Sequence, residues 1–340
     1  MRLLYVTTCR VYGPRLAEVN NLYRASVAGS FPGVDLCGPG LDGAPLDAPL
    51  DLTDLVRRRA PDAVFVSDPW HNFWDPCPDY PNCPPLVTGI DGAACPVILE
   101  AGDSQFYHAE IVRHLLAGDV LDPRAACIRA LSHGWRFDCA QYPRTDEPTR
   151  PPSGVSFKTF YLPHGAYDEM VEASRGVAKK YDVLFSGSDL PDSYPARARI
   201  AAALRSAPDI RTRWLPHPSD QPHDVIGPKF WRALAESRIA VAGTNAYRNL
   251  TMRYLEIPAC GALAVGDVPV PEGDLDAWRG HMIDIGSMST QEIADEIRAS
   301  LRDPGGLVDR TARAREFVLS RHSFRAEFAR LLREVEAWIG

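Results

Sequence analysis

The sequence lacks any long apolar run. No stretch approaches the ~20 consecutive apolar residues of a membrane-spanning helix, although hydrophobic residues make up 45% of the chain. The first apolar segment, Met1–Val6, is too short for a secretory leader and runs directly into a polar loop. These two absences predict a cytoplasmic protein without a membrane span.

The chain also lacks an excess of positive charge. It contains 37 Lys and Arg against 44 Asp and Glu, which gives a formal net charge of −7. This balance argues against broad binding to nucleic acid or to an anionic membrane, although a local basic cleft stays open as an alternative. We therefore expect no nucleic-acid partner, and a homodimer is left open.

No C-x-x-C pair occurs among the eight cysteines. In a cytosolic protein, scattered cysteines are mostly buried, reduced thiols. A zinc site at Cys77, Cys83 and Cys95, with His71 nearby, is the alternative, but their Pro-rich spacing fits no standard zinc pattern. We expect no bound metal.

A glycine-rich G-x-G-x-x-G loop is also absent after the first predicted strand, Arg2–Thr7. That loop is the usual fingerprint of a dinucleotide-binding domain. Its absence disfavours an NAD-dependent oxidoreductase, an alternative that a titration with NADH would test.

What the sequence does contain is an alternation of short apolar runs and helical segments. At 340 residues, the chain is long for one core and comfortable for two domains. Because strands that alternate with helices build parallel sheets, the pattern predicts an α/β protein. The predicted strands lie at 34–37, 63–66, 96–100, 126–131, 157–162, 210–215, 239–242, 262–265 and 280–285, and 181–188 is predicted to be a strand followed by a turn of small residues.

The most informative stretch is 244–265. It opens with a polar loop, and apolar residues then recur with roughly helical spacing over Met252–Ala259. The pair Cys260-Gly261 marks the end of this helix, and the next buried strand follows at once. The stretch and the strand before it therefore form one βαβ unit of a parallel sheet.

Two charged side chains, Arg253 and Glu256, stand out on this short apolar helix. Being three residues apart, they share one helix face, and Asn245 and Asn249 align with them if the helix starts early. An Arg fork suits phosphate oxygens, and a Glu can accept two hydrogen bonds from a ribose diol. A surface Arg–Glu pair beside a glycine cap is the alternative interpretation.

Residues Arg253–Gly261 resemble the R-x-F-E-x-x-A-C-G motif of group 1 glycosyltransferases, and most closely that of the spore-maturation (CgeB-like) branch. The resemblance implies a GT-B fold: two Rossmann-like doubly wound domains facing each other across a cleft, with the last helix crossing back to the first domain. It also implies a nucleoside-diphosphate sugar as donor, with Arg253 toward the diphosphate and Glu256 toward the ribose.

The sequence departs from the family at one position. Many retaining members carry an E-x7-E pair, and Arg248 stands where its first Glu is expected. This replacement keeps open a second function, a catalytically inactive protein that binds nucleotide sugars.

A second match to the family opens the predicted C-terminal domain. Tyr181–Ser188 fits the signature y-D-v-x-F-x-G-s, and Gly187 and Ser188 offer backbone NH groups that can approach a phosphate. The resemblance also implies a phosphate role for Arg197, and Arg199, about one turn away, is the alternative.

Residues of the predicted N-terminal domain are further candidates. His164 and Gly165 follow a Leu-Pro pair that is typical of the family just before its second domain. Asp103 falls just past a predicted strand, and Asp103 or His108 would orient or deprotonate the acceptor. A helix cap is the alternative role for Asp103.

These observations combine into one hypothesis, a glycosyltransferase that moves a sugar from a nucleoside diphosphate to a small-molecule (natural-product) or cell-surface acceptor. Arg197 and Arg253 would stabilise the leaving diphosphate, so neither a metal nor a further cofactor is expected. The family resemblance implies a retaining reaction. The predicted domains are 1–168 on the acceptor side, 169–322 on the nucleotide-sugar side and 323–340 as the helix that packs back.

Overall fold

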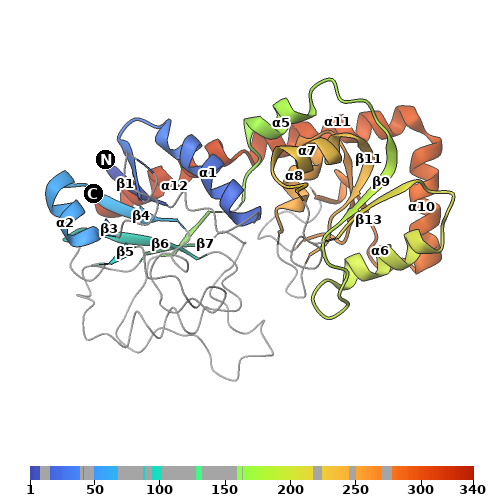
Figure 1. Cartoon of the computed structure of the whole chain (residues 1–340), viewed down its shortest axis with the longest axis horizontal. Helices are drawn as coiled ribbons and strands as arrows, with labels where there is room; N and C mark the ends of the chain where they lie inside the picture. Colours follow the sequence, from blue (N-terminus) through green and yellow to red (C-terminus); the bar gives the residue numbers. More distant parts are fainter. Residues whose placement is uncertain are drawn as a thin grey trace. The chain divides into compact units, whose positions relative to one another are not determined.

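The computed structural model describes residues 1–7, 16–38, 41, 50–67, 87–88, 94–101, 128–131, 159–162, 164–216, 224–244, 250–269 and 278–340. The chain divides into two compact units (Figure 1). Unit 1 comprises Met1–Gly13, Ala17–Pro163 and Phe328–Gly340, and unit 2 comprises Pro14–Leu16 and His164–Glu327. The domains predicted from the sequence are 1–168, 169–322 and 323–340.

Unit 1 contains a parallel sheet with the strand order β2-β1-β4-β6-β7-β8. Its strands are β1 (Leu3–Val6), β2 (Val34–Cys37), β4 (Ala63–Val66), β6 (Val97–Ala101), β7 (Ile128–Leu131) and β8 (Thr159–Tyr161). A short parallel pair joins β3 (Leu50–Asp51) to β5 (Val87–Thr88). The described helices of this unit are α1 (Leu16–Gly29), α2 (Leu52–Arg59) and most of α12 (Phe324–Ile339).

Two inner strands of this sheet, β1 and β4, are buried on both faces. Every residue of β1 and of β4 is buried, as expected for continuous apolar runs in a parallel sheet. The Tyr5 ring stacks on Phe65 at 5.0 Å, and the Phe328 ring of α12 meets Tyr5 edge-on at 5.7 Å. The last helix thus returns to the first sheet, as the GT-B resemblance implies.

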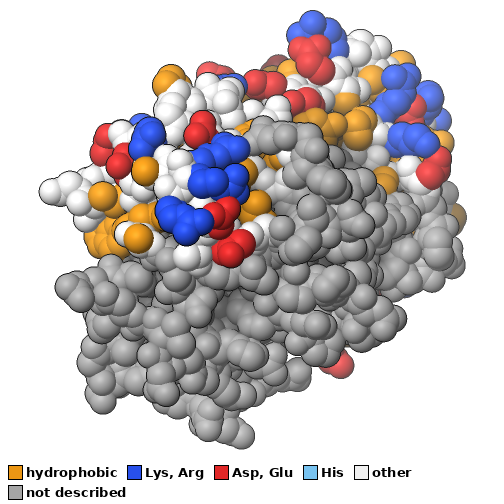
Figure 2. Space-filling model, turned by 60° about the vertical axis from the view of Figure 1, so that its left-hand side comes forward, with side chains coloured by type: hydrophobic (Ala, Val, Ile, Leu, Met, Phe, Trp, Pro, Cys, Tyr) orange, Lys and Arg blue, Asp and Glu red, His pale blue; other side chains and the backbone are white. Residues whose placement is uncertain are grey.

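Acidic and basic side chains are mixed on the surface of unit 1. On α2, the Asp54 carboxylate pairs with both Arg57 and Arg58. The described part of one face of the molecule shows the same mixture of basic and acidic side chains (Figure 2). Of the helices in the described ranges, none is both long and apolar enough to cross a membrane.

Unit 2 contains a second parallel sheet, ordered β10-β9-β11-β12-β13. Its strands are β9 (Tyr181–Ser186), β10 (Thr212–Leu215), β11 (Ser237–Val241), β12 (Leu263–Gly266) and β13 (Met282–Asp284). Its helices are α5 (Asp168–Ser174), α6 (Pro195–Arg205), α7 (Pro228–Ala235), α8 (Arg253–Ala259), α10 (Thr290–Arg302) and α11 (Pro304–Arg321).

The strand order gives this sheet a topological switch point between β9 and β11. The chain first moves outward from β9 to β10 and then returns to the other side of β9 to form β11. In open α/β sheets, ligands bind outside the carboxyl ends of the strands at such a point. Unit 2 therefore has one location that its topology favours for a ligand.

The core of unit 2 follows the period of its strands. Val183 and Phe185 of β9 and Ile239 and Val241 of β11 alternate along the chain and share one cluster with apolar residues of α6, α10 and α11. Successive strand residues point to opposite faces of a sheet, so this spacing places all four on the same face.

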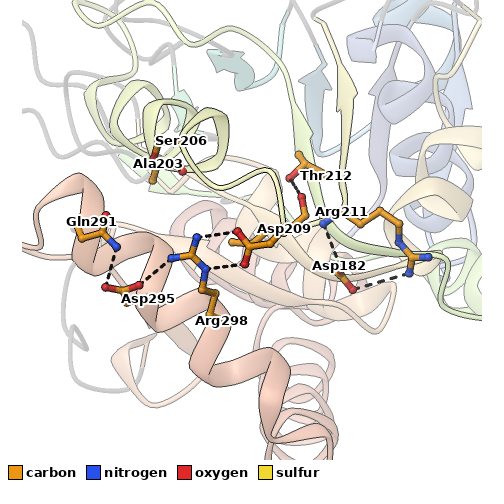
Figure 3. Close-up of polar contacts among 10 residues, drawn as sticks. Asp182, Ala203, Ser206, Asp209, Arg211, Thr212, Gln291, Asp295 and Arg298 are labelled. Atoms are coloured by element: carbon orange, nitrogen blue, oxygen red, sulfur yellow. Dashed lines mark hydrogen bonds and ion pairs between the residues drawn. The ribbon is translucent and has the colours of Figure 1, made fainter.

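At the amino-terminal ends of these strands, carboxylates are paired with cations. The Asp182 carboxylate accepts a hydrogen bond from the Arg211 backbone NH at 3.1 Å and from Arg238 Nη1 at 2.7 Å. Asp209 accepts two bonds of 2.8 Å from Arg298, which also donates to Asp295 of α10 (Figure 3). The charged side chains at this edge of the sheet therefore neutralise one another.

Candidate functional site

Two glycines lie at the switch point, one after each flanking strand. Gly187 follows β9 with φ +92°, a left-handed conformation that favours glycine, and its NH donates to Leu215 O at 3.0 Å. A Cβ at Gly187 would lie 2.9 Å from Arg197 Nη1, and a Cβ at Gly243 would lie 2.6 Å from Arg197 Cγ. The missing side chains thus leave room for the Arg197 side chain across both strand ends.

Arg197 is a buried cation in the first turn of α6. Only 6% of its surface is exposed, and within the described residues its Nε has no hydrogen-bond partner and its guanidinium has no carboxylate in an ion pair. Burial, and then the nearby charge of Arg253, lower its pKa to about 10. A buried charge without an anion is costly, so this position favours an anionic ligand.

Arg199, the alternative from the sequence, has partners of its own. Its guanidinium donates to Gly286 O at 3.0 Å and to Met288 O. It therefore anchors the loop after β13, and of these two candidates Arg197 is the one without such backbone partners among the described residues.

Arg253 and Glu256 share one face of α8, as their spacing predicts, and bond to each other. Arg253 Nη1 donates to Glu256 Oε2 at 2.5 Å, and Trp231 Nε1 donates to Glu256 Oε1 at 3.1 Å. The Arg253 guanidinium also lies 4.0 Å above the Phe230 ring. Glu256 is only 2% exposed, so the pair is part of the protein interior and not a solvent-exposed ion pair.

The start of α8 corrects one expectation. Leu250–Met252 are described and are not helical, and the helix begins at Arg253. An earlier start, which would have aligned Asn245 and Asn249 with Arg253, is therefore wrong. The two asparagines themselves lie outside the described residues.

One carboxylate at the same edge of the sheet, Asp267, was not predicted from the sequence as a site residue and forms several hydrogen bonds there. Asp267 follows β12 and accepts hydrogen bonds from the Thr244 backbone NH at 2.9 Å and from the Thr244 hydroxyl. The Tyr254 hydroxyl donates to the Asp267 carboxylate at 3.1 Å and to its carbonyl at 2.6 Å. Burial, and then the negative charge of Asp267, raise the pKa of Tyr254 well above its ordinary value.

The remaining predicted residues are more scattered. The Ser188 hydroxyl accepts from the Leu190 NH at 3.4 Å in the turn after β9. Gly165 packs against the Phe324 backbone, where a Cβ would lie 2.3 Å from Phe324 Cα, and His164 beside it is half-buried.

Asp103 and His108 lie outside the described residues, as does Arg248. In the described ranges, no group of three His, Cys, Asp or Glu side chains could hold a metal.

The sequence matches one protein family over this unit. Residues 188–333 match the family described as glycosyl transferase-like. The match covers most of unit 2, including α6, α8 and the loop with Asp267. No protein with curated annotation matches the chain.

Solved structures extend the comparison to both units. A glycosyltransferase from Rickettsia africae has a TM-score of 0.59 at 11% identity, over 99% of this chain and 98% of that chain. The alpha-glucosyltransferase AGT, solved with UDP, has a TM-score of 0.58 at 11% identity, over 99% and 100%. HepE from Anabaena, solved with UDP and glucose, has a TM-score of 0.55 at 12% identity, over 99% of both chains.

The family match over residues 188–333, together with the shared fold, supports a glycosyltransferase enzyme. Its fold is GT-B, with two Rossmann-like parallel-sheet units, as the motifs at Tyr181–Ser188 and Arg253–Gly261 predict. Gly187 and Arg197 meet at the switch point, and Arg253, which is bonded to Glu256, lies near enough for its charge to lower the pKa of Arg197. Their roles toward a ligand stay predictions.

Proposed function

We propose that this glycosyltransferase binds a nucleoside-diphosphate sugar at the carboxyl edge of the second sheet and transfers the sugar to a small-molecule or cell-surface acceptor. The observation that carries the proposal is Arg197, a buried guanidinium that lies across two glycines at the topological switch point and has no carboxylate partner in the described residues. UDP in the AGT and HepE structures supports a nucleoside diphosphate as its partner.

The reaction breaks the bond between the anomeric carbon of the sugar and a diphosphate oxygen. A bond from the acceptor oxygen to the same carbon forms, and the acceptor proton passes to the leaving phosphate or to a base. The negative charge that develops on the diphosphate is stabilised by fixed cations and NH dipoles. In this proposal Arg197 and Arg253 supply the cations and the NH groups of Gly187 and Ser188 supply the dipoles.

The finer parts of the proposal rest on the sequence motif. Arg253–Gly261 resembles the spore-maturation (CgeB-like) branch, and from that resemblance we propose a retaining, metal-independent transfer. Asp103 or His108 is the proposed base if the acceptor needs one. Glu256 keeps a proposed role toward the ribose through any lone pairs that Arg253 and Trp231 leave open.

The second candidate function is a protein that binds nucleotide sugars without turning them over. Arg248 at the position of a family Glu favours this candidate. Release of UDP from a UDP-sugar in the presence of acceptors separates the two: steady release supports the enzyme, and tight binding with no release for any acceptor supports the binder.

The direct test is a calorimetric titration of UDP into the wild type and two matched variants. Hydrogen bonds to charged groups contribute about 1.5–3 kcal/mol, so Arg197→Ala is expected to weaken UDP binding about ten- to hundredfold. Arg199→Ala, on the same helix but bonded to backbone carbonyls, is expected to bind UDP like the wild type. Equal affinities in all three proteins would contradict the proposal.

A further inference from the structure

The loop after β12 carries a carboxylate whose two oxygens both face neutral donors. Asp267 Oδ1 accepts from the Thr244 NH at 2.9 Å and from the Tyr254 hydroxyl at 3.1 Å, and Oδ2 accepts from the Thr244 hydroxyl. Among the described side chains, no Lys or Arg forms an ion pair with it. The arrangement differs from that of Asp182 and Asp209, whose oxygens bind arginines. The Asp267 carboxylate therefore holds its hydrogen-bond donors in place and does not neutralise a neighbouring cation by direct contact.

The contact with Thr244 fixes the support of Arg197. Thr244 is the residue after Gly243, and the Arg197 Cγ and Nε lie directly against the space that a Gly243 side chain would occupy. Two hydrogen bonds hold Thr244, one of them to its backbone NH, so the Gly243-Thr244 backbone has little freedom to move. A shift of this backbone would shift the guanidinium that rests on it.

The contact with Tyr254 fixes the start of α8, which carries Arg253. Tyr254 directly follows Arg253, is fully buried and meets the Trp278 ring edge-on at 5.9 Å. Its hydroxyl is held by both the carboxylate and the carbonyl of Asp267. These hydrogen bonds join the first turn of α8 to the loop after β12.

We propose that Asp267 is a positioning residue of the donor site, which holds the supports of both phosphate-binding arginines through Thr244 and Tyr254. The inference rests on the proposed function, since it assigns these arginines to the diphosphate. Asp267 itself needs no contact with the ligand. Its negative charge also acts on Arg197 from a distance and favours the charged guanidinium.

Four variants test the proposal by calorimetric titration with UDP. Thr244→Val and Tyr254→Phe each remove one hydroxyl and keep the shape of the side chain, and each is expected to weaken UDP binding about three- to tenfold. Thr244→Ser, which keeps the hydroxyl, is expected to recover most of the affinity lost in Thr244→Val. Asp267→Ala is expected to have the largest effect of the four.

The control is a carboxylate at the other end of the same sheet. Asp182→Asn alters an acceptor that likewise binds one backbone NH and two side chains, here those of Arg238 and Arg211, and it is expected to leave UDP binding unchanged. Urea denaturation of each variant separates positioning from stability, because a purely structural role would lower the unfolding free energy without changing the affinity of the folded protein.

The outcomes are distinct. Weaker UDP binding by folded Thr244→Val and Tyr254→Phe, with little further loss when either is added to Asp267→Ala, supports the proposal. Wild-type affinity in these variants, with Arg197→Ala still weakened, overturns the positioning role and leaves the proposed function intact. Wild-type affinity in Arg197→Ala as well overturns the proposed function itself.

Discussion

The two edges of the second sheet differ in how their charged side chains are paired. At the amino edge, Asp182 and Asp209 have arginine partners, and the side chains cancel one another's charge. At the carboxyl edge, Arg197 is buried with no carboxylate in contact within the described residues, and the nearby Arg253 adds to its cost. Paired charges at the amino edge neutralise one another, whereas a buried cation without a paired anion is expected to lower stability until an anion binds. The difference favours the carboxyl edge as the ligand-binding edge that we propose.

The largest expected effect concerns Glu256, the carboxylate that neutralises Arg253. Glu256→Ala leaves the Arg253 cation and the Trp231 NH without their partner, and breaking a buried pair costs about 3–5 kcal/mol. Urea denaturation should show an unfolding free energy lowered by about that amount. Glu256→Gln, which keeps an acceptor for Trp231, should lose less. A loss below about 1 kcal/mol in Glu256→Ala would be typical of an exposed pair and would remove the contrast with Arg197.

Arg197 is expected to respond in the opposite direction. Arg197→Met keeps much of the side-chain volume and removes the buried charge, so without ligand the unfolding free energy should rise by about 1–2 kcal/mol. The same variant should bind UDP far more weakly than the wild type. If Arg197→Met is less stable than the wild type in the absence of UDP, the contact of the guanidinium with the Tyr194 ring at 3.9 Å and the charge of Asp267 outweigh the cost of burial, and the comparison fails.

Gly187 gives a smaller effect with a close control. Gly187→Ala places a side chain at φ +92° and should cost about 1–2 kcal/mol of stability. The new methyl would also press on Arg197 Nη1 and weaken UDP binding. Gly176→Ala introduces a similar strain at φ +69° with no atom within 4 Å, so it should lose stability and keep the UDP affinity of the wild type.

The smallest effect is expected at the amino edge. Arg298→Ala removes exposed ion pairs with Asp209 and Asp295, and such pairs contribute little because water screens them. The urea midpoint should shift slightly and the affinity for UDP should stay the same. A clear change in UDP affinity would show that the two edges are coupled.

The sequence predicted the parts of the fold that depend on local pattern. The apolar run 239–242 corresponds to β11 and the run 262–265 to β12, because buried parallel strands need continuous apolar residues. The switch point follows from strand order, which one sequence does not determine. The family resemblance supplied Arg197, although nothing in its local pattern separates it from Arg199.

The contacts that define the site depend on distance in space and were not predictable. Trp231 and Glu256 are 25 residues apart, and Thr244 and Asp267 are 23 apart. Before folding, a Trp NH or a Thr hydroxyl has many acceptors in reach, and spacing does not select one. A weak signal did exist, since Asp267 comes two residues after the predicted strand 262–265, at the edge where parallel sheets bind ligands.

The buried charge of Arg197 has a practical consequence for engineering. A library of variants screened only for survival at high temperature is expected to enrich replacements at this position, because we expect the ligand-free protein to be more stable without the buried guanidinium. Such a screen would discard the residue that we assign to the donor. Rounds of selection for heat resistance should therefore alternate with rounds that require sugar transfer.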